Sequence, residues 1–478
     1  MNSEIRQLEP RNLWNNFADL NAVPRASKKE EQVIAFMKRF GEKLGLETIE
    51  DEVGNVIIKK PATAGMEDRK PIVMQSHLDM VHQKNADTDF DFDTQGIDMF
   101  IDGDWVRAKG TTLGADNGLG VATIMAILES SAIAHPALEA LFTIDEETGM
   151  TGAMGLKGGL LHGKILFNLD TEEDDEIGVG CAGGVDVTAS RSYQMSKTPE
   201  HKSGYTLAVK GLQGGHSGMD IHKGLGNANK IMNRILFSTD SGFGLRISEI
   251  DGGSLRNAIP RESRAQVVVD SQRVNEFELA VNQLAGKIKA ELKTMEPDLQ
   301  ILLKKSELPN SVMEYDVQNR IIRSLYAAHN GVYRMSADIP DLVETSNNIA
   351  RVIVKNGDVK IGCLTRSSVE SSKMDLANAL IATFELAGCH VELSGDYPGW
   401  TPNMESSILK VMDRIYEEMN GEKAHVAACH AGLECGILGT HYPDMEMISF
   451  GPNIKGAHSP DERASISSVK KYWDFVLE

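Results

Sequence analysis

The sequence lacks the features of membrane, secreted and disulfide-linked proteins. Its 478 residues contain no uninterrupted apolar stretch of the ~20 residues that a transmembrane helix needs. The amino-terminal residues lack both the basic start and the apolar core of a secretory signal. The five cysteines are odd in number and form no CxxC pair, which argues against a disulfide framework or a thiolate zinc site. We therefore expect a protein of the reducing cytoplasm.

Positive charge is also scarce. There are 49 Lys and Arg residues against 69 Asp and Glu residues, so the formal net charge is −20. Such a surface repels nucleic acids and anionic membranes, and we expect neither as a partner. The length and the 41% of hydrophobic residues indicate two or three structural units with a substantial core. The excess of carboxylates raises the question of whether some of them gather to hold cations.

Three stretches of the chain differ in pattern. Residues 1–183 alternate helical and strand-like segments, which predicts an α/β fold with a doubly wound, mostly parallel sheet. Residues 184–399 contain shorter alternating strands and helices in two sets of similar order, which favours an inserted, duplicated α+β lid domain. Residues 400–478 return to the first pattern. The predicted architecture is therefore one catalytic domain in two parts, interrupted by the lid.

Polar side chains follow the apolar strands of the predicted sheet. His77 and Asp79 end one strand, Glu146 follows the next, Asp170 follows a third, and His458 lies in the loop after a fourth. Ligands bind outside the carboxyl ends of the strands in an open α/β sheet, so we expect these groups at one edge.

A glycine-rich loop, residues 109–120, adds Asp116 just before a predicted helix. Its four glycines allow the backbone to approach closely while the carboxylate projects. Buried like charges are tolerable when cations lie between them. Two His with several carboxylates suit Zn²⁺, Co²⁺ or Mn²⁺ better than Mg²⁺ or Ca²⁺.

Five short motifs occur in order along the chain. They are His77-Leu-Asp-Met-Val81, Gly114-Ala-Asp-Asn-Gly118, Asp145-Glu-Glu-Thr-Gly149, Asn168-Leu-Asp170 and Gly456-Ala-His-Ser459. Together they resemble the di-zinc metallopeptidase family that includes carboxypeptidase G, aminoacylase and carnosine-type dipeptidases. The resemblance covers essentially the whole chain, including the inserted domain.

The resemblance implies a role for each residue of the predicted centre. Asp116 would bridge two zinc ions, with His77 and Asp170 completing one site and Glu147 and His458 the other. Asp79 would hydrogen-bond the second nitrogen of His77 and fix its tautomer. Glu146 would be the general base, taking a proton from the water that bridges the two ions and passing it to the leaving amine.

The resemblance also implies residues outside this centre. His216 in a glycine-rich turn would stabilise the oxyanion, while Asn257 and Arg366 would hold the substrate and its terminal carboxylate. Gly432 and Glu434 would line the pocket for the substrate's amino end. For His216, Asn257 and Arg366 the competing interpretation is structural, because glycine-rich turns and exposed Arg are common.

The implied reaction is hydrolysis of unblocked dipeptides, including Xaa-His substrates such as β-Ala-His, by a cytoplasmic enzyme. Co²⁺ or Mn²⁺ could substitute for the two Zn²⁺ ions. Three alternatives stay open: an N-acyl-amino-acid deacylase, a tripeptidase, and an inactive scaffold that binds metal or peptide. Relatives in the family are often dimers, so the resemblance also implies a homodimer.

Overall fold

The structure is a computed structural model that describes residues 2–478, and it divides into two compact units. Unit 1 comprises residues 1–180, 402–428 and 433–478, and unit 2 comprises residues 181–401 and 429–432. The helices of unit 1 are α1 (Arg11–Leu20), α2 (Glu31–Lys43), α3 (Ala115–Glu129), α4 (Glu146–Gly149), α5 (Thr151–Gly155), α10 (Ser407–Asn420), α11 (Glu434–His441) and α12 (Ile466–Leu477), preceded by η1 (Ile5–Gln7). Within the described part of the chain, no helix has both the length and the apolar character needed to span a membrane.

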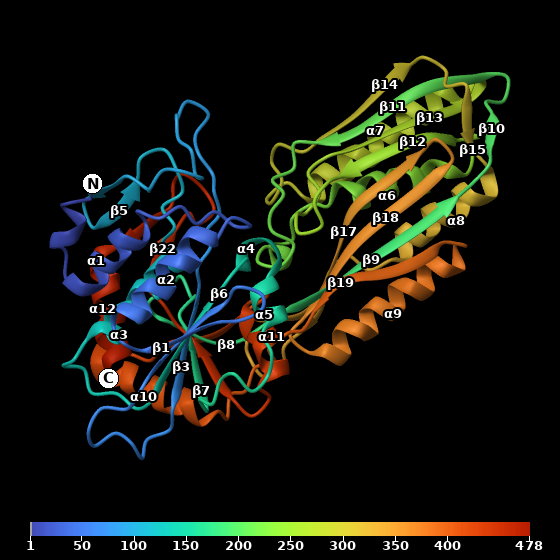
Figure 1. Ribbon diagram of the computed structural model, residues 1–478. Helices are drawn as coiled ribbons and strands as arrows, with labels where there is room; N and C mark the ends of the chain where they lie inside the picture. Colours follow the sequence, from blue (N-terminus) through green and yellow to red (C-terminus); the bar gives the residue numbers. More distant parts are fainter. Residues whose placement is uncertain (1) are drawn as a thin grey trace. The chain divides into compact units, whose positions relative to one another are not determined.

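The main sheet of unit 1 has eight strands in the order β1-β2-β6-β3-β7-β21-β8-β20 (Figure 1). These strands are β1 (Glu47–Glu50), β2 (Val56–Lys60), β3 (Ile72–His77), β6 (Leu138–Thr143), β7 (Ile165–Asn168), β8 (Glu176–Cys181), β20 (His425–Cys429) and β21 (Glu446–Ser449). A four-stranded sheet joins β4 (Met99–Asp102), β5 (Trp105–Ala108), β22 (Ile454–Lys455) and β23 (Arg463–Ser465).

The centre of the main sheet is parallel, and an antiparallel pair adjoins it on each side. Strands β6, β3, β7 and β21 pair in parallel, whereas β1 with β2, β2 with β6 and β21 with β8 are antiparallel. The predicted α/β class is confirmed, with a group of four parallel strands at the centre of the sheet. Because β6, β3 and β7 point the same way, the segments that follow them leave the sheet at one edge.

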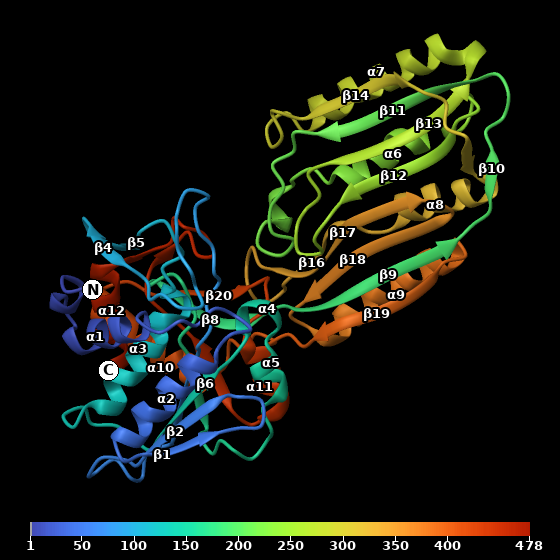
Figure 2. The same ribbon diagram turned by 45° about the horizontal axis from the view of Figure 1, so that its top comes forward.

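Unit 2 carries a nine-stranded sheet, of which eight strands run in the order β14-β11-β13-β12-β17-β18-β9-β19 (Figure 2). Its strands are β9 (Gly183–Ser192), β11 (Lys202–Lys210), β12 (Arg246–Gly253), β13 (Ser263–Asp270), β14 (Gln300–Ser306), β16 (Gly331–Met335), β17 (Val343–Lys355), β18 (Asp358–Ser367) and β19 (His390–Tyr397). Its helices are α6 (Ala228–Asp240), α7 (Val274–Glu291), α8 (Tyr315–Ala327) and α9 (Glu370–Leu386), with two short turns at η2 (Ile221–Lys223) and η3 (Ser271–Arg273). A two-stranded ribbon pairs β10 (Met195–Lys197) with β15 (Ser311–Met313).

The sheet of unit 2 consists of two halves with the same topology. The first half runs β11-α6-β12-β13-α7-β14, and the second runs β9-α8-β17-β18-α9-β19, with the first half inserted after β9. Numbered along each half, both have the spatial strand order 4-1-3-2, and they join where β12 pairs with β17. The predicted duplication is therefore visible in strand order as well as in chain order.

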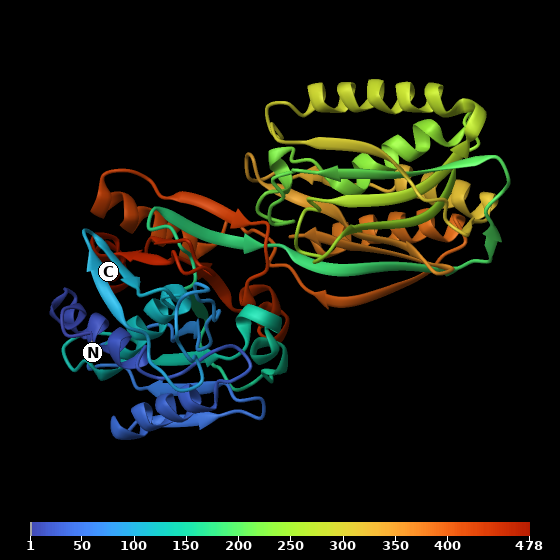
Figure 3. The same cartoon turned by 90° about the horizontal axis from the view of Figure 1, so that it is seen from above.

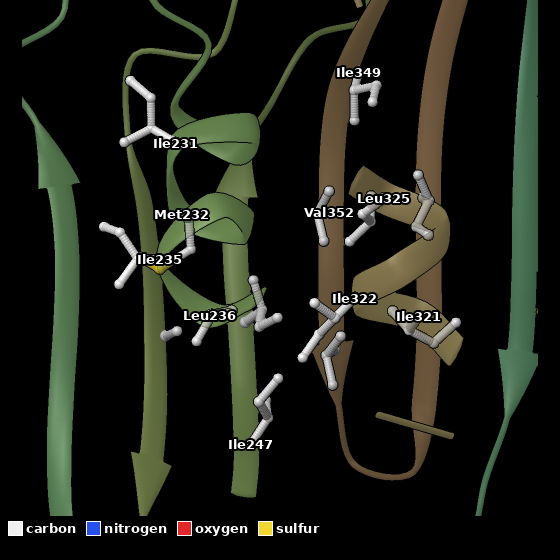
Figure 4. Packing of buried hydrophobic residues seen from close by; sticks show 14 of the residues in the cluster. Ile231, Met232, Ile235, Leu236, Ile247, Ile321, Ile322, Leu325, Ile349 and Val352 are labelled. Carbon is white, nitrogen blue, oxygen red and sulfur yellow. The ribbon is translucent and has the colours of Figure 1, made fainter. Parts of the chain in front are cut away.

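Aliphatic side chains between helices and strands form the core of unit 2. Ile231, Ile235 and Leu236 project from α6, and Ile322 and Leu325 project from α8 (Figure 4). Ile231 and Ile235 lie four positions apart, and Ile322 and Leu325 lie three apart, so each helix presents one apolar stripe to the sheet. In Figure 3 the yellow helix α7 runs alongside the strands and adds Phe277 and its apolar neighbours to this core. The result is a rigid support for the loops at the ends of the strands.

Candidate metal centre

Five side chains of unit 1 meet at the carboxyl edge of its parallel strands. His77 is the last residue of β3, Glu147 lies in α4 directly after β6, and Asp170 follows β7. Asp116 lies in the first turn of α3, and His458 lies in the loop after β22. The five residues that the sequence singled out as ligands thus come from five separate segments.

Asp116 lies between the two histidines. Its Oδ1 is 3.2 Å from His77 Nε2, and its Oδ2 is 3.2 Å from His458 Nε2. Two groups with the spacing of metal ligands share it: His77, Asp116 and Asp170, and Asp116, Glu147 and His458. Within each group the ligand atoms lie within 4.8 Å of one another. A carboxylate that presents one oxygen to each group is suited to bridge two ions.

Protons on the two histidines neutralise part of this acidic cluster. Hydrogen bonds to Asp116 and Glu147 raise the pKa of His458 to about 11. Burial opposes protonation of His77, but Asp170 and Asp116 raise its pKa well above the usual value. The same histidines lower the pKa of Asp116 against the effect of burial. The cluster therefore attracts positive charge strongly, and metal ions bind such groups by displacing their protons.

Two carboxylates of the cluster are poorly compensated. Burial raises the pKa of Glu147, and the nearby Asp116 adds to this effect. Burial also raises the pKa of Asp170, against the effect of His77. Glu147 Oε2 contacts His458 Nε2 at 3.0 Å, but its Oε1 is buried and has no hydrogen-bond partner. A buried acceptor without a donor is costly, and a cation would satisfy it. These residues therefore fit a pair of divalent ions.

Asp79 is fully buried behind His77 and holds more than that ring. Its Oδ1 lies 3.3 Å from His77 Nδ1 and accepts a hydrogen bond from Glu146 N at 3.0 Å. Its Oδ2 accepts hydrogen bonds from Ser27 Oγ at 2.8 Å and from Glu147 N at 3.3 Å. Asp79 thus orients His77, so that Nε2 faces the carboxylates, and also fixes the first turn of α4.

Glu146 lies beside Glu147 on α4 and forms a third candidate group with His77 and Glu147. Burial raises its pKa well above the usual value, and the charges of Asp170 and Glu147 act in the same direction. A carboxylate in this position can accept a proton next to the ligand cluster.

His216 lies in unit 2, in the predicted glycine-rich turn. Its Nδ1 accepts hydrogen bonds from Gly218 N at 3.2 Å and Met219 N at 3.1 Å, which places the proton of the neutral ring on Nε2. A Cβ on Gly218 would stand 2.0 Å from the carbonyl oxygen of His430, so only glycine permits this packing. The turn is thereby pressed against the short 429–432 segment of the same unit.

Arg366 is buried on β18 and is only partly satisfied. Its Nη1 donates to Tyr397 Oη at 2.7 Å, and its Nε is buried without a partner. Burial, together with the charges of Arg366 and His216, lowers the pKa of His430 to about 3. His430 is therefore neutral and hydrogen-bonds Ser346 Oγ at 2.7 Å.

None of the other three predicted binding residues belongs to the candidate ligand groups found among the described residues. The side chain of Asn257 is exposed, and its carbonyl accepts a hydrogen bond from Ser217 N at 2.7 Å. Gly432 is partly buried in the segment before α11. Glu434 is buried in unit 1, where its Oε2 accepts hydrogen bonds from Gln75 Nε2 and Thr143 Oγ1, both at 2.5 Å. Burial raises its pKa to about 8, so it is mainly protonated at neutral pH.

Sequence reasoning missed three residues around the ligands. Arg25 is fully buried and contacts the backbone beside His77 through the carbonyls of Leu78 and Asp79. Glu462 accepts hydrogen bonds from the backbone that leads to Asp116. Nothing in their sequence context distinguishes them. Glu172 lies in a run of acidic residues after Asp170, and burial raises its pKa to about 8. Its spacing of two residues from Asp170 is the only signal that could have found it.

The comparisons with known proteins agree with this geometry. The model described as "Peptidase family M20/M25/M40" matches residues 73–478. The "Cytosol non-specific dipeptidase" of Escherichia coli (strain K12) is 43% identical over 476 residues, which cover 100% of this chain and 98% of that protein. The crystal structure of aminoacylhistidine dipeptidase from Vibrio alginolyticus superposes with a TM-score of 0.91 at 43% identity, covering 99% of this chain and 97% of that chain. Aminopeptidase PepT from Bacillus cereus ATCC 10987 shares the fold at 17% identity, with a TM-score of 0.56 and coverage of 98% and 97%.

Proposed function

The chain belongs to peptidase family M20/M25/M40, and from this premise we propose that it is a dipeptidase that hydrolyses unblocked dipeptides at a dinuclear metal centre. The observation that carries the proposal is Asp116, shared by two ligand groups, with Glu146 beside them. Full-length identity of 43% to two proteins named as dipeptidases supports the substrate class. The name of the Vibrio protein supports Xaa-His dipeptides, including β-Ala-His, as substrates.

We propose zinc as the metal, with Co²⁺ or Mn²⁺ as possible substitutes, because two imidazoles and three carboxylates form a borderline-hard donor set. His77 and Asp170 would hold one ion, Glu147 and His458 the other, and Asp116 both. When bound, two such ions polarise the scissile carbonyl and lower the pKa of water.

The chain's own residues handle the proton. Glu146 takes a proton from the attacking water on its carboxylate and returns it to the leaving amine. Asp79 keeps His77 in the tautomer that metal binding requires. It also holds the first turn of α4 in place, which fixes Glu146 and Glu147 relative to His77.

Residues outside the ligand groups supply the remaining substrate contacts in this proposal. His216, with its proton on Nε2, donates to the developing oxyanion. Arg366 pairs with the substrate's terminal carboxylate, which would satisfy its buried Nε. Asn257 contacts the substrate, and Gly432 and Glu434 line the pocket for its amino end. We further propose that the enzyme acts in the cytoplasm as a homodimer.

A substrate panel tests this function. Purified zinc-loaded protein is offered β-Ala-His, Ala-His, Leu-Gly, a tripeptide and N-acetyl-Ala, and the products are separated by chromatography. We expect cleavage of the free dipeptides and little or none of the tripeptide and the acetylated amino acid. Cleavage of N-acetyl-Ala alone would establish a deacylase instead, and cleavage of the tripeptide alone would establish a tripeptidase. No cleavage of any substrate by protein that holds two ions would support an inactive scaffold.

A further inference from the structure

Glu462 closes the amino end of the helix that carries Asp116. Its side chain is 2% exposed. Its Oε2 accepts hydrogen bonds from Leu113 N at 2.7 Å and Gly114 N at 2.9 Å, and its Oε1 accepts from Ala115 N at 2.7 Å and Asp116 N at 3.3 Å. The residue that precedes α3, Gly114, has no side chain that could do this. One carboxylate therefore satisfies four backbone donors that would otherwise be unpaired at the helix start.

Arg25 supports the same loop from the other side. Its Nη2 donates to Gly114 O at 2.5 Å and Asn21 Oδ1 at 3.0 Å. Its Nη1 donates to Leu78 O and Asp79 O, both at 3.1 Å. Two charged side chains of opposite sign, buried on one short loop, compensate each other where either alone would be costly.

These contacts join three ligand segments. Glu462 lies four residues after His458 and binds the backbone up to Asp116. Arg25 binds that same loop and the two residues that follow His77. Arg25 and Glu462 contact the main chain beside the ligands, so the ligand side chains stay available to bind metal.

We propose that Glu462 is a positioning residue of the metal centre: it locks the Asp116 loop to the His458 segment, so that the Asp116 carboxylate stands between the two histidines before ions bind. The proposal rests on the metal-dependent function above. Loss of these hydrogen bonds leaves every ligand side chain present but allows the Asp116 loop to move, so the ions bind more weakly.

The test is Glu462→Gln. Glutamine has nearly the same shape, but its NH₂ group faces backbone N–H donors, and its neutral side chain removes the largest of the negative charges that act on Arg25. Metal-stripped protein is titrated with Zn²⁺ against a chromophoric chelator, which reports affinity without reference to turnover. We expect affinity for zinc to fall about 10–100-fold, the range typical of groups that orient metal ligands. Glu462→Asp keeps the carboxylate, and we expect it to lose less affinity.

Glu139→Gln is the matched control. Glu139 is also buried in unit 1, and its Oε2 accepts hydrogen bonds from His162 N at 2.6 Å and Gly163 N at 2.9 Å. It lies at the opposite end of β6 from the ligands. We expect this variant to lose thermal stability and keep its zinc affinity.

The proposal is overturned if Glu462→Gln binds two ions as tightly as the parent, or if its loss of affinity matches that of Glu139→Gln at the same fall in melting temperature. If Glu462→Gln does not fold, Glu462→Asp decides: affinity equal to that of the parent overturns the proposal. A parent protein that binds no zinc would instead refute the metal-dependent function, which separates the two failures.

Discussion

Each of the two units buries charged groups that the chain compensates only in part, and these groups differ in sign. Unit 1 gathers Asp116, Glu147 and Asp170 around two histidines, and an oxygen of Glu147 is left without a donor. Unit 2 buries the guanidinium of Arg366 with an unpartnered Nε, next to a histidine held neutral. The carboxylates of unit 1 are suited to bind cations, and the guanidinium of unit 2 is suited to bind an anion.

A second buried cation in unit 2 shows that burial alone does not mark a ligand site. Lys373 has no exposed side-chain surface, but its Nζ pairs with Asp396 at 2.6 Å and with Glu370 at 2.9 Å. Two carboxylates of the same chain therefore compensate its charge. Buried charged groups that have no compensating partner in the chain are the ones to assign to ligands, because an uncompensated buried charge costs several kcal/mol. We propose that unit 1 holds the metals and that unit 2 binds the substrate's carboxylate, and each half of this proposal can be tested.

Removal of metal should have the largest effect. We expect dialysis against a chelator to abolish dipeptide hydrolysis and Zn²⁺ to restore it, since the carboxylates of unit 1 then have only protons to neutralise them. Hydrogen exchange should rise in the segments around Asp116 and Asp170 and stay unchanged in the core of unit 2. Full activity in protein with no measurable metal would refute the proposal that unit 1 holds the metal ions needed for hydrolysis.

Glu146→Gln comes next. The amide cannot accept a proton, so we expect kcat to fall about 10²–10⁴-fold, the usual contribution of a general base. The variant should still bind two ions, because the ligands are intact. Glu147→Gln is the matched control and should lose metal affinity as well as turnover. Appreciable turnover by Glu146→Gln would show that another group moves the proton.

The sequence was sufficient to predict the α/β class and the duplicated insertion. Apolar runs such as Leu138–Thr143 and the paired strand-helix sets of the middle stretch leave a periodic signal. Strand bounds depend on pairing as well as on local pattern: β2 covers Val56–Lys60, and every one of these residues pairs with β6. The short strands β10, β15 and β16 carried too few residues to show a period.

Some residues of the site could be predicted from the sequence pattern, and others could not. His77, Asp116 and Asp170 could be singled out because each follows a strand or a glycine-rich loop, and position relative to an element can be read from sequence. Arg25 and Glu462 bind backbone groups, which every residue possesses, so their partners leave no mark in the sequence. Such residues become visible only when the loops are placed in space.

Arg366→Lys tests the anion side. Lysine keeps the charge but loses the planar fork that binds a carboxylate through two donors. We expect kcat/KM for Ala-His to fall about 10–100-fold, as for loss of a charged hydrogen bond, with zinc affinity unchanged. The parent should prefer Ala-His over its C-terminal amide, and the variant should lose that preference. Arg256→Lys is the control, because Arg256 pairs with Asp186 at 3.0 Å within unit 2. Equal preference in parent and Arg366→Lys would assign the carboxylate to another group.

His430 gives the smallest and most local test. Its folded pKa of about 3 lies below the 6.5 of an unfolded histidine, so below pH 6.5 the unfolded chain takes up a proton that the folded chain refuses. Stability is therefore lost as pH falls from 6.5 towards 3, by roughly 2 kcal/mol between pH 6.5 and 5. His430→Gln should lose less stability than the parent when the pH of urea unfolding is lowered from 7.5 to 5. The exposed His390→Gln should behave like the parent. The same loss of unfolding free energy in the parent and in His430→Gln would mean that His430 is protonated in the folded chain. It would also mean that the charge of Arg366 does not keep His430 neutral.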